Sequence, residues 1–300
     1  MGVPPDHRTT GGILAEYYLL TALALFWVAL RVWVRIRLTR NWGWDDTCIV
    51  LAWLPLFAGL VLIQIEANLG LGRHMIYLQD AETAALQILK YNTFFQMLNV
   101  LCTLLTKYSI SLYLLRIRDD RRLRLGLGVL MLLMTLATIA VIVVLSVSCI
   151  PLQRLWDKSV PGTCLALAAV YNVAYVQSGF TIVVDLCLTM TPIIVLWDVK
   201  IKRGRKTMIC GLMSLGLIAT VSNALRNDFQ SGLTSADMTY DMTAVSVVAI
   251  LELSSGIIAA CIPACAPLLR RNPPTSTMAQ STAYYAPHAG GRSLGGINGG

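Results

Sequence analysis

The sequence predicts an all-α fold: a bundle of seven transmembrane helices with its N-terminus outside the cell and its C-terminus in the cytoplasm. Composition indicates a membrane protein, because 56% of the 300 residues are hydrophobic and only 13% are charged. Soluble domains carry about a quarter charged residues. The apolar stretches give the number of helices, and the Lys and Arg between them give the orientation.

Seven stretches reach the roughly 20 mostly apolar residues that a helix needs to cross a bilayer. They span residues 13–36, 46–66, 86–115, 125–150, 173–197, 207–226 and 242–269. We therefore expect a short extracellular N-terminus at 1–12 and a membrane domain at 13–269. Residues 270–300 are rich in Pro, Ser, Ala and Gly, which predicts a disordered cytoplasmic tail.

The loops between these stretches differ in positive charge, and short cytoplasmic loops hold the excess. The first, third and fifth loops and the tail form the basic set. The other loops and the N-terminus contain only Arg8, Arg73, Arg154 and Lys158, with two further cations at the membrane edge. Because the tail also contains Arg270 and Arg271, we expect it on the same side as the basic loops. An odd number of helices places it there, which favours seven. The basic set comprises Arg37, Arg40, Arg116, Arg118, Arg121, Arg122, Arg124, Lys200, Lys202, Arg203, Arg205, Lys206, Arg270 and Arg271.

The cysteines support the same orientation, because disulfides persist only on the oxidising side of a membrane. Six of the eight cysteines lie inside apolar stretches. Cys149 and Cys164 instead bracket the second external loop. We predict a disulfide between them that closes this loop as a lid.

Polar residues inside the apolar stretches form a candidate site, since a polar group at membrane depth is costly and usually faces the interior of a bundle. Asn92, Gln96 and Asn99 recur at helical spacing in the third stretch. Asp185 in the fifth stretch and Glu252 in the seventh lie at a depth similar to that of Gln96. These five residues are candidates for a ligand site, for a proton-bearing pair of acids or for hydrogen bonds that hold helices together.

Several cofactors are disfavoured by what the sequence lacks. Only three histidines occur and two of them are terminal, so no histidine pair is available for a membrane haem or a zinc ion. Retinal needs a Schiff-base lysine in the last helix, and 242–269 contains none. Lys107 is expected to snorkel toward the inner surface or to form a structural ion pair. The basic residues do not form one face, so we expect no cofactor, no metal and no nucleic-acid partner.

An ordered set of short motifs runs along the chain. They are Trp44-Asp45-Asp46, Gly72-Arg73-His74, Thr106-Lys107-Tyr108-Ser109, Cys149-Ile150-Pro151 and the segment from Gly256 to Pro263. The set resembles the fungal rhodopsin-domain family, which comprises seven-helix integral membrane proteins of rhodopsin-like topology that are often described as similar to G-protein-coupled receptors. The resemblance implies a receptor-like protein of the plasma membrane or an internal membrane, and we expect the plasma membrane.

Two of the motifs also have a direct physical interpretation. Asp45 and Asp46 open the second stretch, where carboxylates accept hydrogen bonds from free amides and favour the positive end of the helix dipole. Pairing of these aspartates with Arg35 or Arg37 is the second possibility. The glycines of Gly70-Leu71-Gly72 indicate an external turn that needs backbone freedom.

We prefer a receptor-like function, in which a small molecule binds between the third, fifth and seventh helices and shifts the inner loops toward a cytoplasmic signalling partner. Arg116 and Arg118 occupy the place where receptors keep a switch arginine, although anchoring by positive charge explains them equally well. The candidate coupling residues are Arg116, Arg118, Arg121, Arg122, Lys200, Lys202 and Arg203.

Two other classes of function are compatible with the sequence. A membrane-embedded, cyclase-like enzyme of secondary metabolism would use Asp185 or Glu252 as its general acid. A small transporter is expected to contain inverted repeats, and the chain has no evident internal repeat. The bilayer itself is a partner under every interpretation.

Overall fold

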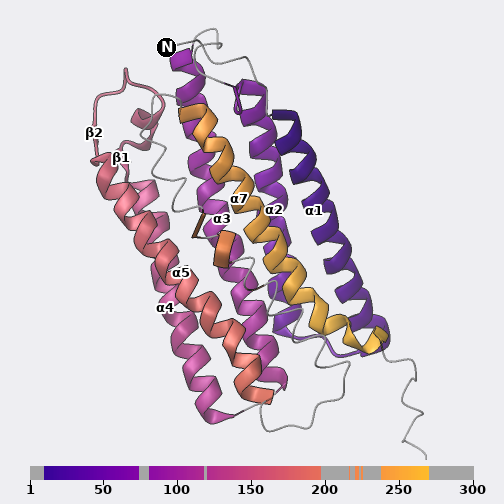
Figure 1. Ribbon diagram of the computed structural model, residues 1–300. Helices are drawn as coiled ribbons and strands as arrows, with labels where there is room; N and C mark the ends of the chain where they lie inside the picture. The colour runs from indigo at the N-terminus through magenta and orange to yellow at the C-terminus, as the bar shows by residue number, and fades with distance from the viewer. Residues whose placement is uncertain are drawn as a thin grey trace, which may run out of the picture.

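The computed structural model describes residues 10–73, 81–117, 120–196, 216, 220–222, 224–225 and 238–269. Long helices dominate, and they run side by side along one axis (Figure 1). The helices are α1 (Thr10–Trp33), α2 (Trp44–Leu69), α3 (Ala81–Ile117), α4 (Arg121–Ser146), α5 (Leu167–Leu196) and α7 (Met238–Cys261). A π-helical turn, η1 (Val34–Leu38), extends α1, and a 3-10 helix, η5 (Ile262–Leu269), extends α7. The predicted all-α bundle is confirmed.

Six helices within the described ranges are long and apolar enough to cross a membrane. The predicted sixth stretch, 207–226, lies largely outside these ranges. Its described residues, 216, 220–222 and 224–225, are helical. Gly216 lies directly against α5, because a β-carbon added there would overlap the hydroxyl group of Thr189.

The helix α3 occupies the centre of the bundle. It packs against α2 over most of its length and also contacts α4, α5 and α7. One apolar cluster fills the space between α1, α2, α3 and α7 and includes Tyr17, Leu56, Phe95 and Ile257. A second cluster joins α3 to α4 and α5. The polar residues of α3 therefore lie between two apolar cores.

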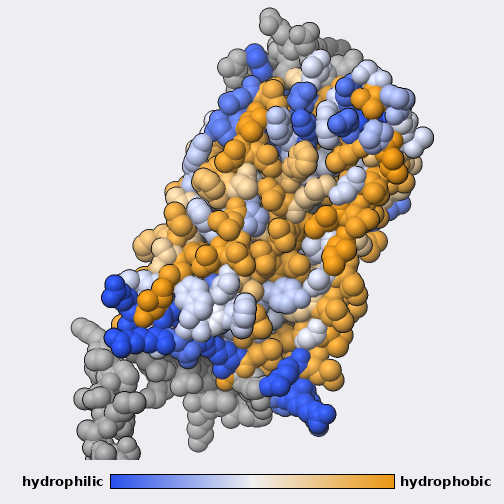
Figure 2. All heavy atoms as spheres, turned by 180° about the vertical axis from the view of Figure 1, so that it is seen from behind, coloured by the Kyte–Doolittle hydropathy of each residue, from blue (hydrophilic) through white to orange (hydrophobic). Residues whose placement is uncertain are grey.

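The outer surface suits lipid. Figure 2 shows an apolar band around the middle of the molecule with hydrophilic residues gathered at both ends. On α4, for example, Leu132, Leu136 and Ile139 each expose at least half of their surface. Exposed apolar surface of this extent would favour association in water, but it is stable against hydrocarbon chains.

Two predicted helix ends are wrong. The fourth stretch was expected to be helical to Ile150, but α4 ends at Ser146 and Cys149–Ile150 form the strand β1. This strand pairs antiparallel with β2 (Thr163–Cys164), with Cys149 opposite Cys164. A residue that is paired across a hairpin cannot continue a helix, so the disulfide loop shortens α4. Likewise the last stretch is α-helical only to Cys261, because Pro263 has no N–H to donate to the preceding turn.

The two ends of the bundle differ. The strands β1 and β2 lie at the end where α1 begins, which we term the hairpin end (Figure 1). The opposite end, where η1 and η5 lie, is termed the tail end. The short 3-10 helix η3 (Leu152–Leu155) lies between the two strands in sequence.

Candidate functional site

Five charged residues meet at the tail end and form the arginine–aspartate cluster, namely Arg31, Arg35, Asp45, Asp46 and Arg116. They come from α1, η1, the first turn of α2 and the last turn of α3. The chain enters α2 through Gly43, whose extended backbone leaves an amide that donates to Asp46 Oδ2 at 3.1 Å. The predicted capping role of Asp46 is therefore confirmed.

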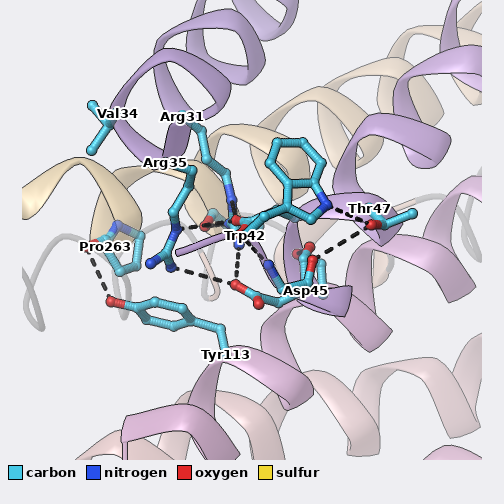
Figure 3. A network of polar contacts seen from close by, with 12 residues as sticks. Arg31, Val34, Arg35, Trp42, Asp45, Thr47, Tyr113 and Pro263 are labelled. Carbon is cyan, nitrogen blue, oxygen red and sulfur yellow. Dashed lines mark hydrogen bonds and ion pairs between the residues drawn. The ribbon is translucent and has the colours of Figure 1, made fainter. Parts of the chain in front are cut away.

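The same two aspartates bind three guanidinium groups (Figure 3). Arg31 bridges them, with Nη2 at 2.7 Å from Asp45 Oδ2 and Nε at 2.8 Å from Asp46 Oδ1. Arg35 adds longer contacts of 3.4 and 3.2 Å to the same oxygens. Arg116 Nη1 lies 2.9 Å from Asp45 Oδ1. The predicted pairing with Arg35 is confirmed.

Other contacts of the cluster reach α7 and η5. Arg31 Nη1 donates to the carbonyl oxygen of Ala260 at 2.6 Å, so all three guanidinium nitrogens of Arg31 have acceptors. The Tyr113 hydroxyl donates to the carbonyl oxygen of Pro263 at 3.1 Å. The Tyr113 ring lies 5.8 and 5.7 Å from the guanidinium carbons of Arg31 and Arg35, within the range of a cation–π interaction.

Burial makes this cluster important for stability. The side chains of Arg31 and Asp46 are completely buried, whereas Arg116 is 25% exposed. Deleting one member of a buried ion pair typically costs about 3–5 kcal/mol, because the partner charge is left uncompensated. The cluster thus locks α1, α2, α3 and α7 together at the tail end. Beside it, Trp44 is 80% exposed, as suits a residue of the interfacial aromatic belt.

The second family motif forms a turn at the hairpin end. Gly70 and Gly72 have positive φ angles of 108° and 86°, which explains the glycines. The turn is held in place because Thr10 Oγ1 donates to the Leu71 carbonyl at 2.8 Å. The amide of Arg73 donates to the Gly70 carbonyl at 3.2 Å. The third motif residue, His74, lies outside the described residues.

The predicted disulfide between Cys149 and Cys164 is present. The loop that it closes packs on the hairpin end of α3 through Trp156, whose ring centroid lies 6.5 Å from that of Phe94. The ammonium of Lys90 lies 5.1 Å from the same indole ring. The loop therefore packs against the side of α3 at Lys90 and Phe94.

Three of the predicted interior residues, Gln96, Asn99 and Glu252, line a cavity of about 40 Å³ between α3, α4, α5 and α7, which we term the central cavity. It is large enough for a few water molecules or a very small ligand. Its polar lining comes from three helices, and the residues of α4 that line it are apolar. The polar residues are Gln96, Asn99, Thr103, Gln177, Ser178, Thr181 and Glu252.

A second cavity of about 40 Å³ lies next to the first and is termed the lower cavity. The two share Thr103 and Glu252 as lining residues. In the lower cavity the ammonium of Lys107 lies 2.8 Å from Asp185 Oδ1 and 3.4 Å from the carbonyl oxygen of Thr181. Of the two alternatives for Lys107, the structure therefore shows the ion pair.

The structure brings together four of the five predicted interior residues. Gln96 and Asn99 line the central cavity, Asp185 lines the lower cavity and Glu252 lines both. Asn92 is buried but lines neither cavity. Of the predicted coupling residues, Arg121 and Arg122 are exposed at the start of α4. Arg118, Lys200, Lys202 and Arg203 lie outside the described residues.

Sequence reasoning missed two parts of the site. Gln177 lines the central cavity and is 9% exposed, yet its Oε1 has no hydrogen-bond partner among the described residues. Its position four residues before Thr181 in an apolar stretch was an available signal. The wall formed by α4 was also missed, because Val141, Val144 and Leu145 give no polar pattern.

Comparison with known proteins points in the same direction as the motifs. The model of the fungal rhodopsin domain matches residues 30–271, which include the arginine–aspartate cluster and both cavities. A SAT4 family membrane protein of Emericella nidulans is 27% identical over 118 residues. The match covers 39% of this chain but only 28% of that relative. No solved structure matches the chain.

Proposed function

The chain belongs to the fungal rhodopsin domain family, and on that premise we propose that it is a receptor-like, multi-pass membrane protein that binds a small molecule other than retinal. The ligand occupies the central cavity and the adjoining lower cavity, between α3, α5 and α7 with α4 as an apolar wall. The protein acts at the plasma membrane, with its hairpin end outside and its tail end in the cytoplasm.

The observation that carries this proposal is the composition of the central cavity. Seven polar residues converge there among valines and leucines, at the depth where polar groups are most costly. Ligand sites have this character: a mostly apolar lining with a few polar groups that fix orientation. Hydrogen bonds between helices alone would not need a cavity.

The path from this cavity to the tail end is continuous. Glu252 lies eight residues before Ala260 on α7, which is about 12 Å along a helix, and the Ala260 carbonyl accepts from Arg31. Thr103 lies on α3, which continues to Arg116. A ligand that shifts either helix changes the contacts of the arginine–aspartate cluster. Release of Arg116 would expose it to a cytoplasmic partner.

Receptor behaviour requires two bundle states with different ligand affinities. To test this, an environment-sensitive fluorophore on Arg121→Cys, at the tail end of α4, would report changes in protein held in lipid nanodiscs. The probes are amines, alcohols and amides of two to five non-hydrogen atoms. At least one probe should raise the unfolding temperature and change the fluorescence, with the same midpoint concentration for both.

The matched control uses two Ala→Leu variants. Ala174→Leu fills part of the central cavity and should abolish both responses. Ala140→Leu adds the same volume on the exposed face of α4 and should leave both intact. Binding without any fluorescence change, for every probe and at further tail-end positions, would argue against receptor behaviour.

The structure also bears on the alternative that the protein is an enzyme, because it distinguishes the two candidate general acids. The Asp185 side chain is held in an ion pair with Lys107, whereas Glu252 lines both cavities, so we assign an acid-catalysed reaction to Glu252. Production of a metabolite that is lost in Glu252→Gln but unaffected by Ala140→Leu would favour this alternative over a receptor.

A further inference from the structure

An open groove of about 510 Å³ lies on the surface of α4, near the tail end where this helix begins (Figure 1). Its described lining residues recur at steps of three and four, so they share one face of the helix. They line neither cavity and do not belong to the arginine–aspartate cluster, so the groove is a separate feature. These residues are Arg121, Arg124, Leu125, Gly128, Val129 and Leu132.

This face of α4 points away from the bundle. Leu127, Met131 and Met134 are buried in the apolar cluster that joins α3, α4 and α5. Leu125 and Leu132, in contrast, expose 70% and 58% of their surface. Because α4 is long and apolar enough to cross the membrane, its outward face meets the bilayer. The groove therefore contacts lipid molecules.

The polarity of the groove changes along its length. The two arginines lie in the first turn of α4, and the residues from Leu125 to Leu132 are apolar or glycine. The distance from Arg121 to Leu132 along the helix axis is about 16 Å. A phospholipid has the same order of groups, with a charged headgroup at the interface and acyl chains beneath it. A soluble protein partner would not reach the apolar part of the groove.

The charge at the start of α4 favours an anionic headgroup. Residues 118–124 contain four arginines and two aspartates, which leaves an excess of two positive charges. Asp120 caps α4 by accepting a hydrogen bond from the amide of Arg122 at 3.3 Å, but the first turn itself contains no acidic residue. Cations at the start of a helix oppose its dipole, so these arginines do not stabilise α4. A guanidinium group has five N–H donors, so it can bind a phosphate beside its other contacts.

Gly128 keeps the middle of the groove open. A β-carbon added there would meet no atom of the described residues within 4 Å, so packing does not require a glycine. Glycine inside a helix is less stable than alanine. Its effect here is to leave room for an acyl chain against the backbone. Gly126 is equally open but does not line the groove.

We propose that this groove binds one anionic phospholipid, whose phosphate is held by Arg121 and Arg124 and whose acyl chain lies along Leu125, Gly128 and Leu132. The site goes beyond the proposed small-molecule function and does not depend on it.

The test counts lipids bound to the full chain by native mass spectrometry in mild detergent. Phosphatidylserine is titrated against phosphatidylcholine with the same acyl chains, because the choline cation cancels the phosphate charge. Glycerol 3-phosphate supplies a phosphate without chains. The first phosphatidylserine should bind at least about tenfold more tightly than phosphatidylcholine, since each basic residue near the headgroup contributes to the attraction. Glycerol 3-phosphate should show no saturable binding over the same concentrations.

Matched variants localise the site. Arg121→Gln and Arg124→Gln should each weaken phosphatidylserine binding about fivefold. Arg122→Gln removes the same charge from the same turn but lies outside the groove, so it should leave the affinity unchanged. Gly128→Leu fills the groove and should weaken binding, whereas Gly126→Leu adds the same side chain outside it and should not. All five positions are exposed, so these variants should fold.

Four outcomes would overturn the proposal. Equal affinity for the two lipids would show that charge is not recognised, and an equal loss in Arg122→Gln would show that only the surface charge matters. Saturable binding of glycerol 3-phosphate as tight as that of the lipid would indicate a phosphate site without a lipid. Unchanged lipid affinity in both Arg121→Gln and Arg124→Gln would leave these arginines to a cytoplasmic partner. None of these results bears on the central cavity.

Discussion

The arginine–aspartate cluster and the central cavity both bury polar groups in the same bundle, but the hydrogen-bond partners of these groups differ between the two regions. In the cluster, Arg31 has an acceptor for each of its three guanidinium nitrogens, including the Ala260 carbonyl. In the central cavity, no residue within the described ranges donates to Gln177 Oε1. Saturated polar contacts fix the positions of helices, while unsaturated contacts beside a cavity are available to a ligand. Substitutions should therefore affect stability in the cluster and binding in the cavity.

The largest expected effect is in the cluster. Asp46→Ala leaves the fully buried Arg31 without one of its two carboxylates and removes the cap of α2. The free energy of unfolding should fall by about 3–5 kcal/mol. Chemical denaturation in mild detergent measures this loss, with the exposed Asp157→Asn as control. A loss below about 1 kcal/mol would mean that the cluster behaves like a surface ion pair.

The Lys107–Asp185 pair lies between the two regions, and its disruption should lower the free energy of unfolding by a smaller amount. Lys107→Met strands the Asp185 carboxylate, which is 14% exposed, and should cost about 2–4 kcal/mol. The double variant Lys107→Met/Asp185→Leu removes both charges and should recover part of this loss. A double-mutant cycle on unfolding free energies gives the coupling. Additive losses would show that the 2.8 Å contact contributes nothing.

Arg116→Gln should lower the free energy of unfolding by about 1–2 kcal/mol, which is less than Asp46→Ala or Lys107→Met, because the Arg116 side chain is 25% exposed and solvent screens its charge. Its more specific effect should be on the Arg121→Cys fluorophore, whose signal in the unliganded protein should move toward the liganded value. Arg122→Gln, at an exposed position with no place in the cluster, is the control. An unchanged signal would show that release of Arg116 is not part of the response.

The smallest effect on stability is expected in the central cavity. Gln177→Leu replaces an amide whose Oε1 has no partner in the described part of the chain, so the unfolding free energy should change by less than about 1 kcal/mol in either direction. Ligand binding should nevertheless be weakened. A loss of stability as large as that of Asp46→Ala would show that Gln177 holds the bundle together rather than a ligand.

The sequence allowed the helices and the disulfide to be predicted, because the length and charge of a segment and the place of a cysteine in it are local properties. The partner of an aspartate is not local. Arg31 lies in an apolar stretch where no local pattern marks it as the partner of an aspartate, yet it makes the shortest contacts to Asp45 and Asp46. The rotation of α1 against α2 decides this pairing, and helical periodicity does not specify that rotation.

The same limit applies to the cavity. Gln96, Asn99, Asp185 and Glu252 were found because charged and amide groups stand out in apolar stretches. Asn92 fits the same face of α3 but lines neither cavity, because the space closes one turn nearer the hairpin end. The part of the lining that α4 contributes could not be predicted, because valine and leucine occur both at lipid-facing positions and at positions that face a cavity.

The bond from Arg31 to the Ala260 carbonyl has a consequence for genetics. Any residue at position 260 supplies the same backbone oxygen, so the identity of that residue carries no information about the contact. Only the small space around the buried Ala260 restricts it. A mutational scan should therefore find position 31 intolerant of every substitution and position 260 tolerant of glycine and serine, although the two residues share one bond.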